Sequence, residues 1–317
     1  MCLECILLTR CEQLHHLNSF PDRAAPSYEQ PHPMSSRYQS GNAQLNYAEN
    51  GSGMPVVFLH PTPLDHSYWL PLIAQLGGGN GAGDFRTIVP DFRGHGGSEL
   101  GGSLPVGWFE RVPDAPVLTM RQLAADVLAL LDKLSIAEAV FVGCSIGGYV
   151  MLELWRQTPQ RIRGMAFICS KPQPDAEPAL IKRASNIAIA RQSGVSSLFD
   201  SMTPLLIGES ARRSRPEIVA ECRARMTLSP EAFIAVQAGL ATRPDSIPTV
   251  ATIQCPLLAI AGGDDTAVAP ADMKAFRSAP GDCEFHLIPD AGHFAAYEKP
   301  QQVSELLGDW LQRFRLR

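Results

Sequence analysis

The stretch AVFVGCSIGGYVMLEL, residues 139–154, decides the fold of this chain. Its first part, AVFVGC, is a short apolar run, partly β-branched, which is typical of a strand buried on both faces of a parallel sheet. The residues from 147 onward have the pattern of a helix. Between them, GCSIG (143–147) fits the G-x-S-x-G pattern of a sharp turn from strand to helix. The sequence therefore predicts a nucleophile elbow with Ser145 at its tip.

The elbow explains why glycine stands on both sides of the serine. A sharp strand-to-helix turn forces its middle residue into a strained backbone conformation, and the residues two positions away would collide if they were large. Gly143 and Gly147 meet this need. The turn lifts the Ser145 hydroxyl to the carboxyl edge of the sheet, where the helix N-terminus favours negative charge. The alternative is that Ser145 merely caps an ordinary helix.

Strand patterns and helix patterns alternate on both sides of this turn. Short apolar or alternating runs predict strands at 42–50, 55–60, 85–91, 164–169, 256–261 and 283–288. Amphipathic patterns predict helices at 70–76, 121–134 and 303–314, with Thr119 as the N-cap of the second. This alternation predicts an α/β fold, a mostly parallel central sheet with helices on both faces.

The alternation stops in two places, which divide the chain into four segments. Residues 1–37 contain four prolines and no sustained period, so we expect a disordered or weakly ordered tail. Between 171 and 248 we expect a helical cap, with helices near 180–191, 216–225 and 230–240. The predicted core is then formed by 38–170 and 249–317.

Composition excludes several classes of protein. The chain has 317 residues, with 27 Lys and Arg against 32 Asp and Glu, so its net charge is −5. This charge argues against nucleic acid as the main partner. No apolar run approaches the roughly 20 residues that span a bilayer, so we expect no membrane partner. Five cysteines scattered singly through residues 144–283 favour free thiols in a reducing cytoplasm, which is the predicted location.

A metal site has one weak candidate. Cys2 and Cys5 have the spacing of metal ligands, and His15 or His16 could complete a zinc site. The more favoured interpretation is a tail without function. We therefore expect no metal and no organic cofactor.

A reactive serine needs a base and a carboxylate, and both types of residue follow predicted strands. His293 lies in DAGHF, directly after the strand pattern at 283–288. Asp264 and Asp265 follow the strand pattern at 256–261. All three therefore lie at the carboxyl edge of the sheet with Ser145, in the chain order Ser, Asp, His of one known fold. These arguments leave open which aspartate orients the histidine.

Four motifs together resemble the α/β-hydrolase superfamily over residues 44–314. They are HPTPLDHSYW (60–69), DFRGHGGS (91–98), GCSIGG (143–148) and DAGHFAAYEKP (290–300). The chain is especially similar to the subgroup of 3-oxoadipate enol-lactonases and cofactor-free haloperoxidase-like esterases. The G-x-x-D pattern of the family implies Asp265 as the acid. It also implies an oxyanion hole made by the backbone N–H groups of Thr62 and Ile146.

The resemblance implies a serine hydrolase that cleaves a small-molecule carboxylic ester or lactone through Ser145, His293 and Asp265 and an acyl-enzyme. Two alternatives stay open: a perhydrolase or cofactor-free haloperoxidase that uses the same triad, and a non-catalytic ligand-binding homologue. The sequence specifies neither the substrate nor the oligomeric state. Candidate pocket residues are Trp69, Trp108, Phe199, Met202 and Phe233.

Overall fold

The computed structural model describes residues 35–77 and 85–314. In these residues eight strands form one sheet, in the order β1-β2-β4-β3-β5-β6-β7-β8. The strands are β1 (Ser35–Ser40), β2 (Ala43–Asn50), β3 (Met54–Leu59), β4 (Phe85–Pro90), β5 (Ala139–Cys144), β6 (Ile162–Ile168), β7 (Leu257–Gly262) and β8 (Cys283–Ile288). The six strands from β4 to β8 in this order are parallel, and β1 and β2 are antiparallel. The predicted α/β fold is confirmed.

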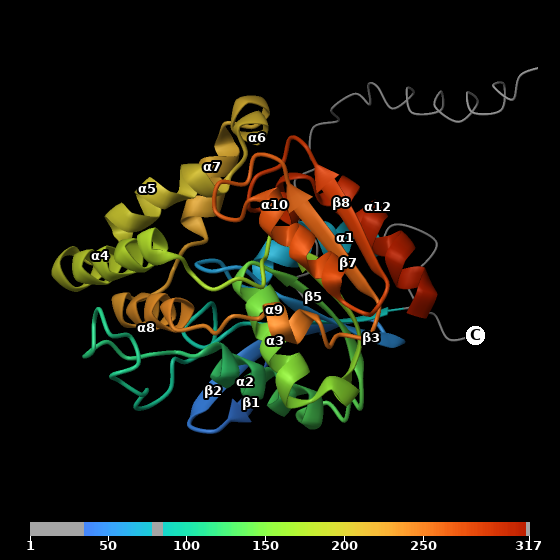
Figure 1. Ribbon diagram of the computed structural model, residues 1–317, viewed down its shortest axis with the longest axis horizontal. Helices are drawn as coiled ribbons and strands as arrows, with labels where there is room; N and C mark the ends of the chain where they lie inside the picture. The colour runs from blue at the N-terminus through green and yellow to red at the C-terminus, as the bar shows by residue number, and fades with distance from the viewer. Residues whose placement is uncertain (1–34, 78–84, 315–317) are drawn as a thin grey trace, which may run out of the picture. The chain divides into compact units, whose positions relative to one another are not determined.

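Helices cover both faces of the sheet (Figure 1). On one face α1 (Leu70–Gly77) packs against α12 (Pro300–Leu311), and on the other α2 (Met120–Lys133) packs against α3 (Ile146–Gln157). This double cover explains why β5 and β7 are buried at every residue. The predicted N-cap of α2 is confirmed, because the Thr119 side chain accepts a hydrogen bond of 3.1 Å from the Gln122 N–H.

A run of helices between β6 and β7, which we call the helical insertion, occupies residues 177–250. It consists of α4 (Glu177–Ser193), α5 (Ser196–Leu206), α6 (Glu209–Ser214), α7 (Glu217–Ala224), α8 (Pro230–Ala241) and α9 (Ile247–Val250). In Figure 1, α4 to α8 gather on the left, away from β8 and α12. The sequence pattern missed α5 and α6, because Pro204 interrupts α5 and α6 has only six residues.

Short helices complete the described residues. They are η1 (His66–Trp69), η2 (Pro159–Arg161), α10 (Pro270–Met273), η3 (Lys274–Ser278), α11 (Ala295–Glu298) and η4 (Gln312–Phe314). In the described part of the chain, no helix is long and apolar enough to cross a membrane. The cysteines found there, residues 144, 169, 222, 255 and 283, are free thiols.

The N-terminal boundary differs from the expected one. Residues 35–37, assigned to the weakly ordered tail, belong to β1, which pairs with β2 from Ser35 to Ser40. The hydrophobic pattern does not predict this strand, because its sequence, SSRYQS, is polar, which is common in edge strands. Tyr38 is its buried anchor and meets Tyr47 edge to face, with ring centroids 5.9 Å apart. The zinc candidate at Cys2 and Cys5 lies outside the described residues.

A buried ion pair ties this edge strand to the rest of the core. Arg93 follows β4, and its guanidinium binds the carboxylate of Asp126 on α2 through Nε–Oδ2 and Nη2–Oδ1 contacts of 2.6 and 2.8 Å. Both side chains are only 3% exposed. Ser40 at the end of β1 donates to Asp126 at 2.6 Å and accepts from Arg93 at 2.7 Å through its carbonyl. One charge pair therefore joins a strand, a loop and a helix.

Replacing Asp126 with Asn should destabilise the fold strongly. The Arg93 charge would stay buried without its counter-charge, which typically costs about 3–5 kcal/mol. Urea unfolding measures the change in the free energy of unfolding. The control is Glu209→Gln, which removes an exposed pair with Arg213, where we expect less than about 1 kcal/mol. Equal losses in the two variants would contradict this role of the pair.

Candidate active site

Ser145 lies where β5 turns sharply into α3. Its backbone has φ 52° and ψ −115°, a conformation that non-glycine residues rarely adopt. Its N–H donates to the carbonyl of Ile168 in β6 at 3.1 Å. Its carbonyl accepts from the Gly148 N–H at 3.0 Å and from the Ser170 hydroxyl at 2.9 Å. The strained turn is therefore held on both sides by hydrogen bonds.

The two glycines of the elbow are needed for space. A Cβ on Gly147 would overlap the carbonyl oxygen of Leu59 at the end of β3. A Cβ on Gly143 would lie 2.6 Å from the carbonyl carbon of Gly147. The start of α3 thus packs directly on the neighbouring strands.

His293 and Asp265 are hydrogen-bonded to each other at the same edge of the sheet. The Nδ1 of His293, in the loop after β8, lies 2.8 Å from Oδ2 of Asp265, in the loop after β7. The other oxygen of Asp265 accepts the N–H groups of Ala267 and Val268 at 2.8 and 2.9 Å. The Asp265 side chain is fully buried and that of His293 is 3% exposed. Since an ionised carboxylate only accepts, Nδ1 carries the proton and Nε2 presents its lone pair.

The two neighbouring aspartates have different partners. Asp264 does not meet His293; its Oδ2 accepts the Ser210 N–H at 3.4 Å, at the start of α6. Of the two aspartates left open by strand position, Asp265 is the one hydrogen-bonded to His293.

A buried histidine shapes the loop after β3. His60 is fully buried, and its Nδ1–H donates to the Pro61 carbonyl at 3.0 Å, while its Nε2 accepts the Phe92 N–H at 3.0 Å. Burial lowers the pKa of His60, which keeps the ring neutral. The ring therefore acts as a fixed brace between the ends of β3 and β4.

A second neutral histidine holds Thr62. His95 donates from Nδ1 to the Arg93 carbonyl at 2.9 Å, so its Nε2 accepts the Thr62 hydroxyl at 3.0 Å. Burial lowers the pKa of His95 to about 3. Through Arg93 this contact reaches the buried pair with Asp126.

Two backbone N–H groups at this edge of the sheet have no hydrogen-bond partner in the described part of the chain. Among the described residues, neither the Thr62 nor the Ile146 N–H is hydrogen-bonded. Ile146 is the first residue of α3, so it has no acceptor inside the helix. Because Leu59 pairs with Gly143, the loops that carry the two groups begin on adjacent strands. Pro61, between His60 and Thr62, has no N–H group to offer.

One cluster of described side chains has the composition of a metal site. It consists of Asp65, His66 and Asp91. Their donor atoms already have partners, since His66 donates from Nδ1 and from its backbone N–H to Oδ1 of Asp91 at 2.7 and 2.8 Å. Burial alone would lower the pKa of His66, but the hydrogen bond to Asp91 raises it overall. The geometry indicates a charged pair that fixes the turn before η1.

Cys144, next to the serine, points into the core. Its Sγ accepts from the Tyr68 hydroxyl at 3.3 Å and donates to the His293 carbonyl at 3.6 Å. The side chain is fully buried, and burial raises the pKa of the thiol well above its usual range. The thiol is therefore not a nucleophile. It joins η1 and the loop after β8, which carries His293 and which we call the histidine loop, to the elbow.

The five predicted pocket residues belong to three different parts of the fold. Trp69 is fully buried against Phe58, with ring centroids 5.4 Å apart, and Trp108 is 59% exposed on the loop before α2. Within the helical insertion, Phe199 and Phe233 pack edge to face at 5.6 Å, and Met202 is half-buried. These positions favour a core role for Trp69 and a surface role for Trp108. The other three stay predictions.

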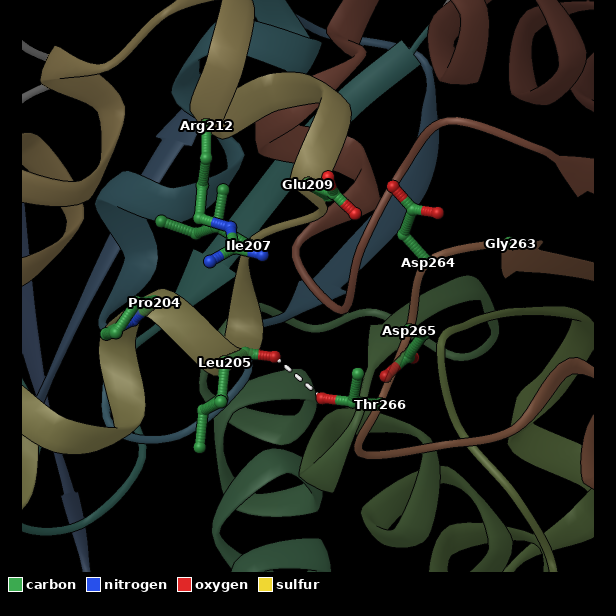
Figure 2. Close-up of a pocket in the computed structure, with 9 residues that line it drawn as sticks. All are labelled: Pro204, Leu205, Ile207, Glu209, Arg212, Gly263, Asp264, Asp265 and Thr266. Atoms are coloured by element: carbon green, nitrogen blue, oxygen red, sulfur yellow. Dashed lines mark hydrogen bonds between the residues drawn. The ribbon is translucent and has the colours of Figure 1, made fainter.

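A cavity of about 310 Å³ lies between the insertion and the loop after β7. Figure 2 shows the residues that line it. The lining residues are Pro204, Leu205, Ile207, Glu209, Arg212, Gly263, Asp264, Asp265 and Thr266. The Thr266 hydroxyl donates to the Leu205 carbonyl at 2.8 Å and closes one side. Asp265 belongs to this wall, but Ser145 and His293 do not, so the cavity lies beside the candidate site.

Comparison with known proteins places the chain in a family. The sequence model described as "Alpha/beta hydrolase family" matches residues 56–306. A protein from Mycobacterium tuberculosis, provisionally named non-heme bromoperoxidase BpoC, is 27% identical over 82% of this chain and 94% of its own length. The 3-oxoadipate enol-lactonase 1 of Acinetobacter baylyi is 24% identical over 86% of this chain and 92% of its own.

A solved structure agrees with these relatives. A thermophilic esterase from Thermogutta terrifontis superposes with a TM-score of 0.78, at 29% identity, over 89% of this chain and all of its own. The chain belongs to the α/β-hydrolase family. Its relatives include an esterase and an enol-lactonase, which supports the prediction of a hydrolase that acts on ester bonds. The resemblance to this superfamily and subgroup is confirmed.

The structure adds one residue that the sequence reasoning did not single out. Glu298 lies five residues after His293 and is only 4% exposed. In the sequence this residue is marked only as a lone carboxylate at the end of the apolar run FAAYE (294–298), within the motif DAGHFAAYEKP.

The elbow generates a stability prediction with an internal control. Gly147→Ala should destabilise the chain by about 1–3 kcal/mol, because the new methyl overlaps the Leu59 carbonyl. Gly308→Ala makes the same change in the interior of α12, where the nearest atom is a Leu76 methyl at 3.6 Å. It should be neutral or stabilise by up to about 1 kcal/mol. Thermal unfolding of the two variants distinguishes them, and similar shifts would contradict the close approach.

Proposed function

We propose that this chain is a serine hydrolase of a carboxylic ester or lactone, with Ser145, His293 and Asp265 as its triad. The observation that carries the proposal is the buried 2.8 Å contact between His293 Nδ1 and Asp265, at the sheet edge where the elbow presents Ser145. The contact sets the imidazole tautomer that can take a proton at Nε2. The relatives named esterase and enol-lactonase agree with this class of substrate.

The proposed reaction has two halves. Ser145 Oγ attacks the carbonyl carbon while His293 Nε2 takes the hydroxyl proton, and Asp265 stabilises the resulting imidazolium. The N–H groups of Ile146 and Thr62 donate to the oxyanion. His293 then gives its proton to the leaving alkoxide, and the alcohol or the opened end of the lactone departs. Water attacks the acyl-enzyme with His293 again as base, which releases the acid and restores Ser145.

The helical insertion is proposed to act as the cap that supplies the substrate pocket. Of the three cations of α4, Lys182 is exposed and the other two are paired: Arg183 binds Asp175, and Arg191 binds Asp114 at 3.1 Å. Their neutralisation favours an uncharged acyl or alcohol group in the part of the pocket near α4. This is a proposal about polarity and leaves chain length to experiment.

Hydrolysis of p-nitrophenyl esters of graded chain length tests the triad. Wild type should show a burst followed by turnover, and Ser145→Ala should lose both while staying folded. Asp265→Asn should lower kcat by about 10³–10⁴-fold, because the imidazole loses its orienting carboxylate. Asp264→Asn, the matched control, should keep wild-type kcat. Activity that survives in Ser145→Ala would overturn the mechanism, and inert wild type on esters and lactones would favour a ligand-binding role.

Perhydrolysis is a second candidate, favoured by the relative provisionally named bromoperoxidase. Hydrogen peroxide would replace water as the attacker of the acyl-enzyme and release a peracid. In a mixture of acyl donor, peroxide, bromide and monochlorodimedone, the peracid oxidises bromide, which then brominates the monochlorodimedone. Wild type should brominate it, and Ser145→Ala should not. Bromination that persists in Ser145→Ala would exclude an acyl-enzyme route.

A further inference from the structure

Glu298 presents a buried carboxylate to the backbone on both sides of His293. Its Oε2 accepts the Gly292 N–H at 2.9 Å, and its Oε1 accepts the Phe294 N–H at 3.2 Å. The histidine therefore lies between two residues that are held by one side chain. Because α11 ends at Glu298, the carboxylate closes the loop back onto its own start.

The same carboxylate also holds the helical insertion. Its Oε2 accepts a second hydrogen bond, from the Gly208 N–H between α5 and α6, at 2.9 Å. The two glycine backbones are in direct contact, since a Cβ on Gly208 would lie 2.6 Å from the Gly292 nitrogen. Only glycine at both positions lets two N–H groups converge on one oxygen. The Phe294 N–H is shared with the Leu206 carbonyl of α5 at 3.2 Å.

The carbonyl groups of the loop are fixed independently of Glu298. The thiols of Cys169 and Cys144 donate to the carbonyls of Gly292 and His293 at 3.5 and 3.6 Å. Such thiol hydrogen bonds are weak, whereas charge-assisted bonds from an N–H group to a carboxylate are about twice as strong as neutral ones. Glu298 is therefore the dominant polar anchor of the loop.

The charge of Glu298 also acts on the imidazole. Burial raises the pKa of Glu298 overall, while its three N–H donors and the neighbouring His293 offset part of that shift by favouring the ionised carboxylate. A negative charge at this place favours the imidazolium that forms in each half of the proposed reaction. Asp265 thus binds the imidazole of His293 directly, whereas Glu298 binds the backbone N–H groups on both sides of that residue.

We propose that Glu298 is a positioning residue for His293, which holds the ring at the angle that proton transfer requires and couples it to the insertion through Gly208. The proposal rests on the proposed function, since it needs His293 as the acid and base. An error of about 1 Å in such a group can cost roughly 100-fold in rate. A purely structural carboxylate would instead change only the fraction of folded protein.

The test compares two leaving groups on one acyl chain, p-nitrophenyl butyrate and ethyl butyrate. The p-nitrophenolate leaves without a proton, whereas ethoxide must receive one from His293. Rates are expressed per active site, from burst titration, so that loss of folded protein does not count. Glu298→Gln should lower kcat/KM by about 10-fold on the aryl ester and about 100-fold on the ethyl ester. KM for the aryl ester should change less than about threefold, since the pocket itself is not altered.

Two further variants complete the experiment. Glu298→Asp keeps the charge but is one methylene too short to reach the loop, so it should not restore the rate. Glu153→Gln, a carboxylate of similar burial in α3, is the matched control and should keep wild-type rates per site. It lies two turns from Ser145, roughly 12 Å along the helix.

The outcomes separate this proposal from the function on which it rests. Unchanged rates per site in Glu298→Gln, or equal losses on the two esters, would overturn the positioning role while Ser145→Ala remains inactive. Activity in Ser145→Ala would overturn the proposed function itself. Loss on both esters in Glu153→Gln as well would show a general effect of lost carboxylates and would also count against the proposal.

Discussion

The whole site depends on how closely the start of α3 packs against the end of β3. A glycine at 147 lets the helix backbone touch the Leu59 carbonyl, and this contact allows the chain to turn through Ser145 at φ 52°. A strained residue persists only where its surroundings over-determine it. Here the neighbouring strands do so, through the hydrogen bonds of Ser145 to Ile168 and Ser170. The same approach brings the two unpaired N–H groups to adjacent loops.

Charge is distributed around the elbow in a consistent way. His60 and His95, which hold the loop after β3 through hydrogen bonds, are kept neutral by burial. Thr62 is bound to His95, and His95 to the Arg93 carbonyl. The Arg93 side chain in turn forms a buried ion pair with Asp126, so these two charges neutralise each other. No unpaired charge is therefore needed to hold the candidate oxyanion loop. Negative charge is concentrated instead at Asp265 and Glu298, on the two sides of His293.

The sequence predicted the elements whose physics is local. The elbow, the buried parallel strands and the N-cap at Thr119 follow from spacing and apolar runs, and the structure has them. It could not predict β1, because a polar edge strand is stabilised by its partner β2 and not by its own pattern. It also could not separate a core tryptophan from a pocket tryptophan, since the burial of Trp69 depends on its packing against Phe58 in β3, which is distant in the sequence. Glu298 shows the same limit: a carboxylate in an apolar run becomes interpretable only when the N–H groups of distant residues converge on it.

The insertion is joined to the core at both of its ends. Toward α4 the contacts include the ion pairs Arg111–Glu177 and Arg191–Asp114, whose side chains are 38–74% exposed, and the buried carboxylate of Asp175, which binds Arg183 and Arg243. Such exposed pairs contribute about 0–1 kcal/mol each.

At the other end, the insertion meets the histidine loop and η1. Glu298 binds the Gly208 N–H, the Arg225 guanidinium donates to the Ser67 hydroxyl at 2.8 Å, and the Tyr297 hydroxyl donates to Glu221 at 3.2 Å. Arg225 also lies over the Tyr297 ring, 5.5 Å from its centroid. A buried carboxylate whose donors leave keeps its desolvation cost without compensation, so separating the insertion from the histidine at this end is costly. The residues of the insertion beside His293 are thus fixed to the loop that carries it, as a site that depends on the angle of one imidazole requires.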